Sequence, residues 1–275
     1  MPDAQIIEIV RLALAEDLGS GDVTSRVCIP EAARARGVFL AREAMVLAGT
    51  AVLPVVYELA GGDARLELLR QDGARVSDGD VIARVEGNAR RLLECERVAL
   101  NFLQRLSGVA TVASRFARAV EGTGCRVLDT RKTTPGLRLL EKMAAHAGGA
   151  VNHRMGLFDA ILIKNNHIAA AGGVCAALQA AATAGLPVEI EVRTRQELED
   201  ALRCGARHLL LDNLTPAEAR EQIAFIAGRA KVELSGGITL ETVRTYAETG
   251  ADFVSAGAMT HSARAMDLSF RLELL

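Results

Sequence analysis

The sequence predicts an α/β protein in which an open β/α barrel follows a smaller N-terminal α/β domain. Short apolar runs alternate with helix-like segments through the second half of the chain, and each run ends on a charged, hydroxyl-bearing or glycine residue. This alternation is typical of parallel strands joined by right-handed crossovers. Six such strands in roughly 150 residues are fewer than the eight strands, in about 250 residues, of a complete barrel. We therefore expect the barrel to be incomplete.

The composition argues against nucleic-acid and membrane partners. Among 275 residues, 32 are basic and 34 acidic, with a formal net charge of −2, so any anion binding must be local. Aromatic residues make up 3% of the chain, which makes stacking of nucleobases a poor explanation. The uncharged run at 168–188 is long enough to span a bilayer, but it is rich in Ala and contains Gly172, Gly173 and Pro187. We expect it to form a buried helix instead.

The cysteines suggest neither a metal site nor a disulfide site. They are odd in number and include no CxxC pair: Cys28, Cys95, Cys125, Cys175 and Cys204. We therefore expect no zinc site, no disulfide framework and a reducing cytoplasm as the location. The acidic N-terminus lacks the basic start and the small-residue cleavage site of a signal peptide.

The N-terminal domain is predicted to begin with a helix at 5–16, where apolar residues recur at helical spacing. Short β-type runs follow between 37 and 86, separated by Gly and Asp. Their turns are similar to the hairpins of biotinyl and lipoyl carriers, but no lysine occupies the turn at 77–80, which argues against a carrier. A long helix from Arg90 to about Val120 is apolar on several sides and is expected to join the two domains, with Gly108 as a candidate break.

We place an N-terminal domain at 1–107, ending in the linking helix, and the barrel with its active site at 108–264. A tail at 265–275 is expected to pack back on the N-terminal domain. Two barrel helices are predicted to open with capping boxes, Thr194 to Glu197 and Thr215 to Glu218, the second with Pro216 at its first position.

The polar ends of the six strands identify the face that carries function. In a β/α barrel the carboxyl ends of the strands share one face, and active sites lie there. The runs end at Asp129, Lys164, Glu191, Asp212, Ser235 and Gly257.

Positive charge is concentrated between residues 129 and 167. This stretch gathers seven basic residues around three carboxylates: Arg131, Lys132, Arg138, Lys142, His153, Arg154 and Lys164, with Asp129, Glu141 and Asp159. Arginine binds carboxylate or phosphate in a two-pronged geometry, whereas lysine supplies a mobile point charge. The stretch therefore indicates an anion site. The alternative is a solvated charged face with internal ion pairs.

Two consecutive strand ends bring Glu191 and Asp212 to the same face. Carboxylate oxygens suit Mg²⁺, which is often held by one or two carboxylates together with substrate phosphates. Pairing with Lys164 and Arg131 for structural reasons is an alternative, and both roles are compatible. The last strands end in LSGGIT and VSAGAMTH, where glycines allow backbone N–H groups to approach a phosphate.

With these residues in place, the sequence resembles the quinolinate phosphoribosyltransferase family. The matching stretches are EDLGSGDVTS, LLECERVALNFLQRLSG, LDTRKTTPGLRLLEKM, GGAVNHRMGLFDAILIKNNH, VEIEV, LLLDN, LSGGI and SAGAMTHSARAMDLS. They occur in order from about residue 16 to the C-terminus. The resemblance implies an N-terminal α/β sandwich domain, an open barrel of six or seven strands, and a homodimer, or a higher assembly, whose active sites are shared between subunits. The chain differs from many bacterial members at 142–147, including His146.

The resemblance also implies the reaction and its residues. Phosphoribosyl pyrophosphate and quinolinate would give nicotinate mononucleotide, pyrophosphate and CO₂, with Mg²⁺ as cofactor. Quinolinate would be bound by Thr130, Arg131, Lys132, His153, Arg154 and Lys164, with Arg97 from the partner subunit. The ribose, metal and phosphates would be served by Glu191, Asp212, Ser235, Gly236, Gly257 and His261. We expect Lys132, Lys164, Glu191 and Asp212 to be catalytic, and Glu191 and Asp212 to hold the metal.

Three other functions are compatible with parts of the sequence. A relative associated with molybdenum uptake would share the fold, but the intact TRKT, NHR and LIKNNH motifs argue against it. A Schiff-base aldolase would use Lys164 at its strand end, yet a doubled anion site is superfluous there. A sensor that binds a phosphorylated metabolite would show binding without turnover.

Overall fold

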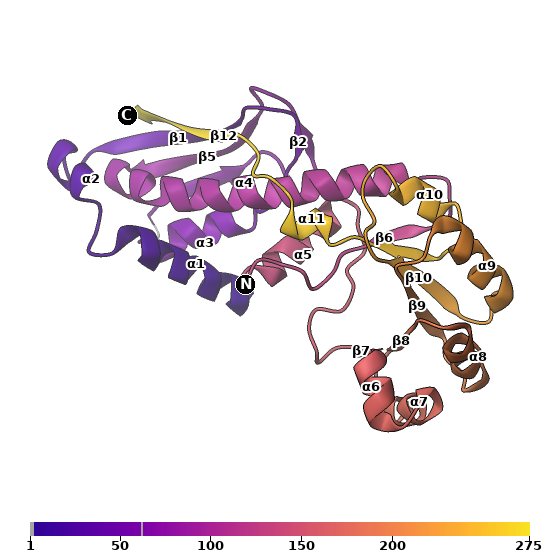
Figure 1. The fold of residues 1–275 in the computed structure, drawn as a ribbon. Coiled ribbons are helices and arrows are strands. Elements are labelled where there is room, and N and C mark those ends of the chain that lie inside the picture. Colours follow the sequence, from indigo (N-terminus) through magenta and orange to yellow (C-terminus); the bar gives the residue numbers. More distant parts are fainter. Residues whose placement is uncertain (1–2, 62) are drawn as a thin grey trace. The chain divides into compact units, whose positions relative to one another are not determined.

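The computed structural model describes residues 3–61 and 63–275. The chain divides into two compact units (Figure 1). The first contains Met1–Ser114, Thr133–Gly149 and Ser262–Leu275, and the second contains Arg115–Lys132 and Ala150–His261. Each unit is therefore assembled from segments that are separate in sequence.

The first unit is built on an antiparallel sheet with the strand order β12-β1-β5-β3. Strand β1 pairs with β12 from Ala35 opposite Leu274 to Ala41 opposite Leu268, so the C-terminal strand completes the N-terminal sheet. Phe39 and Phe270 lie opposite each other with ring centroids 4.9 Å apart. The strands of this unit are β1 (Arg34–Ala41), β2 (Met45–Val46), β3 (Arg65–Leu68), β4 (Arg75–Val76), β5 (Val81–Asn88) and β12 (Leu268–Leu274).

Several helices belong to the same part of the chain as this sheet, and the longest of them is α4 (Ala89–Ala119) (Figure 1). The predicted long helix is confirmed, but Gly108 does not break it. A Cβ at Gly108 would lie 1.9 Å from the carbonyl oxygen of Arg264, so the glycine allows the chain near the C-terminus to approach the helix. The predicted first helix is confirmed as α1 (Ala4–Leu18). The remaining helices are α2 (Val23–Cys28), α3 (Val52–Leu59) and α5 (Arg138–Ala147).

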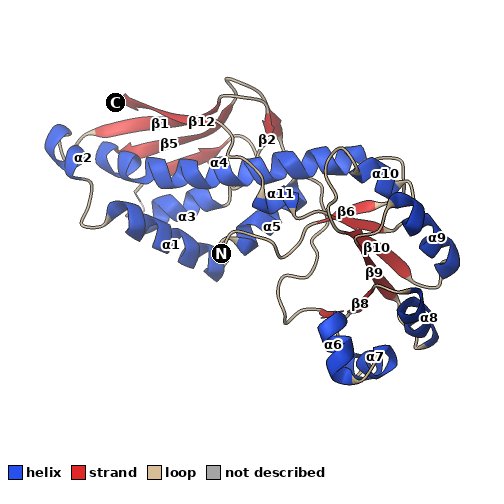
Figure 2. Cartoon of the chain, in the orientation of Figure 1, coloured by secondary structure: helices blue, strands red, loops and turns tan. Residues whose placement is uncertain are grey.

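The second unit is the predicted open barrel. Its six parallel strands have the order β6-β11-β10-β9-β8-β7, and no ladder in the described residues pairs β6 with β7 to close it. Figure 2 shows α8, α9 and α10 along one side of these strands. The strands are β6 (Arg126–Leu128), β7 (Ile161–Ile163), β8 (Val188–Val192), β9 (His208–Asp212), β10 (Lys231–Ser235) and β11 (Phe253–Ser255). The helices are α6 (Asn165–Ala171), α7 (Val174–Ala182), α8 (Arg195–Arg203), α9 (Pro216–Ile226), α10 (Val243–Ala247) and α11 (Ala258–His261).

Local sequence signals account for several of these boundaries. The Thr215 hydroxyl accepts the Glu218 N–H, and the Glu218 carboxylate accepts the Thr215 N–H, which confirms the capping box of α9. At α8, the Thr194 side chain accepts the Glu197 N–H as predicted. The Glu197 carboxylate instead accepts the N–H of Arg193.

Two expectations were wrong. The run at 168–188 does not form one buried helix: it contributes to α6, which is mostly exposed, and to α7, which is partly buried, because Gly172 takes a left-handed conformation (φ 85°) and ends α6. Among the described residues, no helix is long and apolar enough to cross a membrane.

A disulfide joins Cys175 to Cys204, with 5.4 Å between their Cα atoms. The expectation of no disulfide failed because spacing in sequence does not report that α7 and the end of α8 lie side by side.

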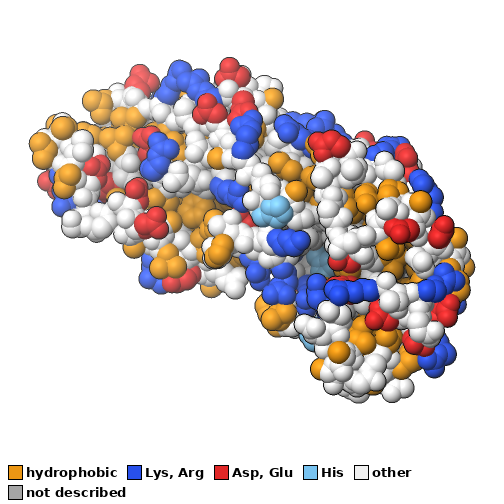
Figure 3. Space-filling model, in the orientation of Figure 1, with side chains coloured by type: hydrophobic (Ala, Val, Ile, Leu, Met, Phe, Trp, Pro, Cys, Tyr) orange, Lys and Arg blue, Asp and Glu red, His pale blue; other side chains and the backbone are white. Residues whose placement is uncertain are grey.

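Charges are mixed over the face of the molecule that Figure 3 shows. Lys and Arg side chains are interspersed there with Asp and Glu, in keeping with the net charge of −2. This distribution agrees with the inference that any anion binding is local.

Candidate active site

A cavity of about 350 Å³ lies at the carboxyl ends of the barrel strands. Its lining comes from β7, β9, β10 and β11, from the residue directly after β7, and from the chain between β6 and β7. The lining residues are Thr130, Arg131, Lys132, His153, Arg154, Leu162, Lys164, Leu210, Asp212, Glu233, Ser235 and Ser255. Eight residues predicted for the site therefore surround one cavity: Thr130, Arg131, Lys132, His153, Arg154, Lys164, Asp212 and Ser235.

Buried Asp129 holds the loop that carries His153 and Arg154. Its carboxylate accepts the side-chain amide of Asn152 at 2.6 Å and the backbone N–H of His153 at 2.8 Å. A few residues on, Asp159 accepts the backbone N–H groups of Met155 and Gly156. Two carboxylates of the charged stretch thus shape the loop by binding its backbone.

Two guanidinium groups, those of Arg131 and Arg154, line the cavity together. Burial and the neighbouring charge of Arg131 lower the pKa of Arg154, and Arg154 also donates to the carbonyl oxygen of Ala160 at 3.2 Å. Like charges at such a position repel one another, and a bound dianion relieves the repulsion. The chemistry of the pair therefore suits carboxylate groups.

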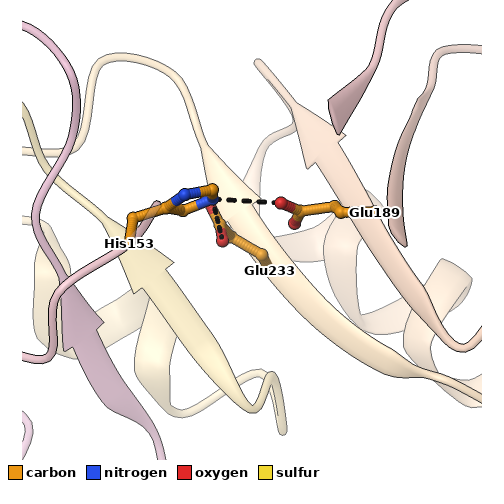
Figure 4. Close-up of side chains that lie close together, drawn as sticks. All are labelled: His153, Glu189 and Glu233. Carbon is orange, nitrogen blue, oxygen red and sulfur yellow. Dashed lines mark hydrogen bonds and ion pairs between the residues drawn. The ribbon is translucent and has the colours of Figure 1, made fainter. Parts of the chain in front are cut away.

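At the floor of the cavity, one imidazole nitrogen faces two glutamates (Figure 4). His153 Nε2 lies 3.0 Å from Glu189 on β8 and 3.4 Å from Glu233 on β10. Glu189 and Glu233 are 5% and 1% exposed. On the other side of Glu189, His208 Nε2 lies 3.5 Å away. We call His153, Glu189 and Glu233 the floor cluster.

The floor cluster changes the proton affinity of its members. Burial alone would lower the pKa of His153, but hydrogen bonds to Glu189 and Glu233 raise it to about 9. The Arg154 N–H donates to His153 Nδ1 at 2.7 Å, so a second ring proton at Nδ1 would disrupt that contact, which opposes the rise. Burial tends to raise the pKa of Glu189, but hydrogen bonding to His153 gives a net decrease; burial raises the pKa of Glu233.

Beside the cavity, Lys164 and Arg193 bind the two oxygens of Glu191. Lys164 Nζ lies 3.2 Å from Oε2, and Arg193 donates to Oε1 at 2.7 and 3.0 Å. The alternative prediction that Glu191 pairs with Lys164 is thus confirmed. Asp212, on the next strand, accepts the side-chain amide of Asn213 at 2.7 Å.

The glycines at the last strand ends permit close packing. Gly236 has φ 98°, and a Cβ there would lie 2.3 Å from Asn213 Oδ1. A Cβ at Gly257 would lie 2.9 Å from Lys132 Cδ and 3.1 Å from His261 Cδ2. The backbone therefore passes directly beside Lys132 and His261.

Other predicted residues lie elsewhere. Arg97 is exposed on α4, and Arg138 and Lys142 lie on α5, all in the first unit. Lys142 and Glu141 are fully buried, and Glu141 binds Arg105 at 2.7 Å. Residues at the site that were not predicted are Glu189, Arg193, His208, Glu233 and Ser255. The signal for Glu189 and Glu233 is a Glu inside the apolar strands VEIEV and KVELS, where a buried carboxylate requires a partner; Arg193, His208 and Ser255 have no comparable signal.

Comparisons with known proteins show the family to which the chain belongs. The family models for the N-terminal and C-terminal domains of quinolinate phosphoribosyl transferase match residues 22–107 and 109–271. The chain is 38% identical to the probable nicotinate-nucleotide pyrophosphorylase (carboxylating) of Bacillus subtilis, over 100% of this chain and 96% of the relative. The crystal structure of NadC from Streptococcus pyogenes is 40% identical with a TM-score of 0.94, covering 98% of this chain and 97% of that one. The structure of the nicotinate-nucleotide pyrophosphorylase from Francisella tularensis is 36% identical in sequence with a TM-score of 0.95, covering 99% of this chain and 98% of that one.

Proposed function

Because the chain belongs to the quinolinate phosphoribosyltransferase family, we propose that it transfers the phosphoribosyl group of phosphoribosyl pyrophosphate to the ring nitrogen of quinolinate. Loss of CO₂ would then give nicotinate mononucleotide and pyrophosphate, a step of NAD biosynthesis. The proposal rests on one observation. Arg131 and Arg154, Lys132 and Lys164, and residues at the ends of the later strands all line the same cavity. A dicarboxylate and a polyphosphate substrate together need such a concentration of cations.

Arg131 and Arg154 are proposed to bind the two carboxylates of quinolinate. Tight binding of the carboxylate that departs would stabilise the ground state and slow its loss. The arginines should therefore hold the 3-carboxylate more firmly than the 2-carboxylate. Inhibition constants for nicotinate and picolinate test this assignment, and tighter binding of picolinate would contradict it.

The phosphoribosyl pyrophosphate site is proposed at the later strand ends. Asp212, Ser235, Gly236, Gly257 and His261 would bind its ribose and phosphates. Lys132 and Lys164 would neutralise charge that develops on the leaving pyrophosphate, while the ribosyl carbon becomes oxocarbenium-like. The pyridine nitrogen then attacks the opposite face of that carbon, and no protein nucleophile is needed. Once alkylated, the ring nitrogen is a pyridinium that accepts the electrons left by CO₂.

Mg²⁺ is proposed as the cofactor, and the two predicted carboxylates fit it unequally. Asp212 is half-buried on the cavity wall and fits a metal that is shared with substrate phosphates. Glu191 fits less well, because Lys164 and Arg193 already bind both of its oxygens. When bound, the metal would supply charge neutralisation at pyrophosphate. We assign Glu191 chiefly to the orientation of Lys164. Normal turnover after exhaustive chelation would exclude the metal.

A homodimer with shared active sites is also proposed, in which Arg97 serves the cavity of the partner. Its support is the resemblance of the ECERVALNFLQ helix, on which Arg97 is exposed. Inactive Arg97→Ala and Lys164→Ala chains, mixed and reassembled, should recover part of the activity if the sites are shared. No recovery despite proven exchange of subunits would contradict this.

The decisive assay uses purified protein, quinolinate, phosphoribosyl pyrophosphate and Mg²⁺. Nicotinate mononucleotide and CO₂ should form in equal amounts, and the absence of both would refute the proposal. The ion pair of Lys164 with Glu191 disfavours the aldolase alternative, because a Schiff base requires a neutral amine. The proposed location is the cytoplasm. Cell fractionation tests it, together with the redox state of Cys175 and Cys204 in extracts.

A further inference from the structure

A second cavity meets the proposed substrate cavity at the floor cluster. It has a volume of about 220 Å³ and includes residues at the amino ends of the barrel strands, among them Arg126, Val188 and Phe253. His153 and Arg154 line both cavities. Glu233 lines the substrate cavity, whereas Glu189 and His208 line the second one. The floor cluster therefore lies between the two spaces.

The hydrogen bonds of the floor cluster place a proton on Glu233. Because His153 Nδ1 accepts the Arg154 N–H, the proton that the glutamates attract lies on Nε2. Glu189 accepts it at 3.0 Å and also lies near His208, so Glu189 is the ionised carboxylate. Glu233 Oε2 is buried 3.4 Å from Nε2 but is not aligned to accept the proton that Nε2 donates to Glu189, and the ligand atoms of the floor cluster lie within 4.8 Å of one another. Two buried carboxylates this close do not both ionise, so Glu233 is the neutral acid.

A metal ion is a weaker explanation of the same geometry. His153, Glu189 and Glu233 are close enough to share one cation. However, a metal needs the lone pair of Nε2, and the hydrogen bond to Nδ1 leaves the ring proton on Nε2. The arrangement is thus suited to holding a proton.

The proposed reaction requires a proton donor in the substrate cavity. When CO₂ leaves, its bond to C2 of the ring breaks and the electron pair remains on C2, stabilised by the adjacent pyridinium nitrogen. A proton must then bond to C2. The Arg and Lys side chains that line the cavity are poor sources. Arginine does not release a proton at neutral pH, Lys164 is paired with Glu191, and Lys132 is assigned to the leaving pyrophosphate.

We propose that Glu233 is the acid that delivers this proton to C2. This assignment rests on the proposed function. The O–H bond of Glu233 breaks as the C2–H bond forms, and the resulting carboxylate takes a proton from water that enters the substrate cavity when the products leave. Protonation of C2 makes the loss of CO₂ irreversible, because a carbanion that is not protonated can recombine with CO₂ before CO₂ leaves the cavity.

The test compares Glu233→Gln, Glu233→Asp and the wild type, with Glu199→Gln as the control. Glu199 lies on α8, where its half-exposed carboxylate pairs with Arg195, so its replacement leaves the cavity intact. Pyrophosphate and CO₂ are measured in the first turnover, together with quinolinate binding at equilibrium. The deuterium content at C2 of the product is measured by NMR after reaction in equal parts of H₂O and D₂O.

Glu233→Gln should bind quinolinate within about threefold of the wild type and release pyrophosphate ahead of CO₂. Its kcat for nicotinate mononucleotide should fall roughly 100-fold, the usual contribution of a general acid. The deuterium content should move to the value for direct protonation by water. Glu233→Asp should recover part of the rate. Equal release of both products at the wild-type rate, or loss of pyrophosphate release despite normal binding, overturns the assignment.

If Glu233→Gln does not fold, the proposal is tested with the wild-type protein alone. Its deuterium content at C2 is compared with that from thermal decarboxylation of an N-alkylquinolinate in the same solvent mixture. Equal values mean that water is the donor and overturn the proposal; different values support a donor on the protein. A wild type that makes no nicotinate mononucleotide refutes the proposed function, and the assignment of Glu233 falls with it.

Discussion

Replacing Glu191 by Gln removes one charge from between Lys164 and Arg193 while conserving the shape of the side chain. Glu191 is 3% exposed, and the cations on its two oxygens are each about half exposed. Hydrogen bonds between charged groups contribute about 1.5–3 kcal/mol, and solvent screening of the cations favours the lower half of that range. We expect Glu191→Gln to lower the free energy of unfolding by about 2 kcal/mol.

The same change should affect the chemistry through Lys164. Without its partner, the Lys164 ammonium can leave the position that Glu191 gives it, and a mobile cation neutralises developing charge less well. We expect kcat to fall at least tenfold, with a smaller change in the KM for quinolinate.

Urea unfolding and steady-state kinetics measure these effects, with Glu199→Gln as the matched control. Glu199 pairs with Arg195 on the surface of α8 at 3.0 Å, and an exposed pair at this spacing contributes about 0.3–0.5 kcal/mol. A loss of stability for Glu191→Gln no larger than that of the control, with unchanged kcat, would refute the reasoning.

Two further outcomes are expected. Thiol titration of the denatured, unreduced protein should find three free cysteines, and reduction should lower the unfolding free energy by up to about 3.5 kcal/mol for the 29-residue separation of Cys175 and Cys204; Cys175→Ser should abolish the effect of reductant. Gly236→Ala should destabilise by about 1–3 kcal/mol and raise the KM for phosphoribosyl pyrophosphate, since a side chain at φ 98° is strained and collides with Asn213.

The sequence predicted features that depend on neighbouring residues or on strand order. The caps at Thr194 and Thr215 are local, so their patterns were sufficient to place the starts of α8 and α9. The convergence of Arg131 and Lys164 followed from a rule of topology, because parallel strands present their carboxyl ends on one face.

Features that depend on distant residues were not predictable in this way. The disulfide requires Cys175 and Cys204 to meet across two helices, and a count of cysteines carries no such distance. The role of Arg193 was missed because Arg193 comes directly after β8 and belongs to no motif in the sequence. Its contact depends on the direction in which the Glu191 carboxylate points.

The strand VEIEV contained a signal that the prediction used only in part. A parallel strand covered on both faces normally consists of apolar residues, yet β8 carries Glu189 and Glu191 at a spacing of two and buries both. Side chains at that spacing point to the same side of a strand, so both carboxylates must meet cations or protons inside the barrel. Glu191 meets Lys164 near the mouth, and Glu189 meets His153 one layer deeper. The alternation therefore predicts two layers of charge: an outer one suited to the departing pyrophosphate and an inner one that holds a proton.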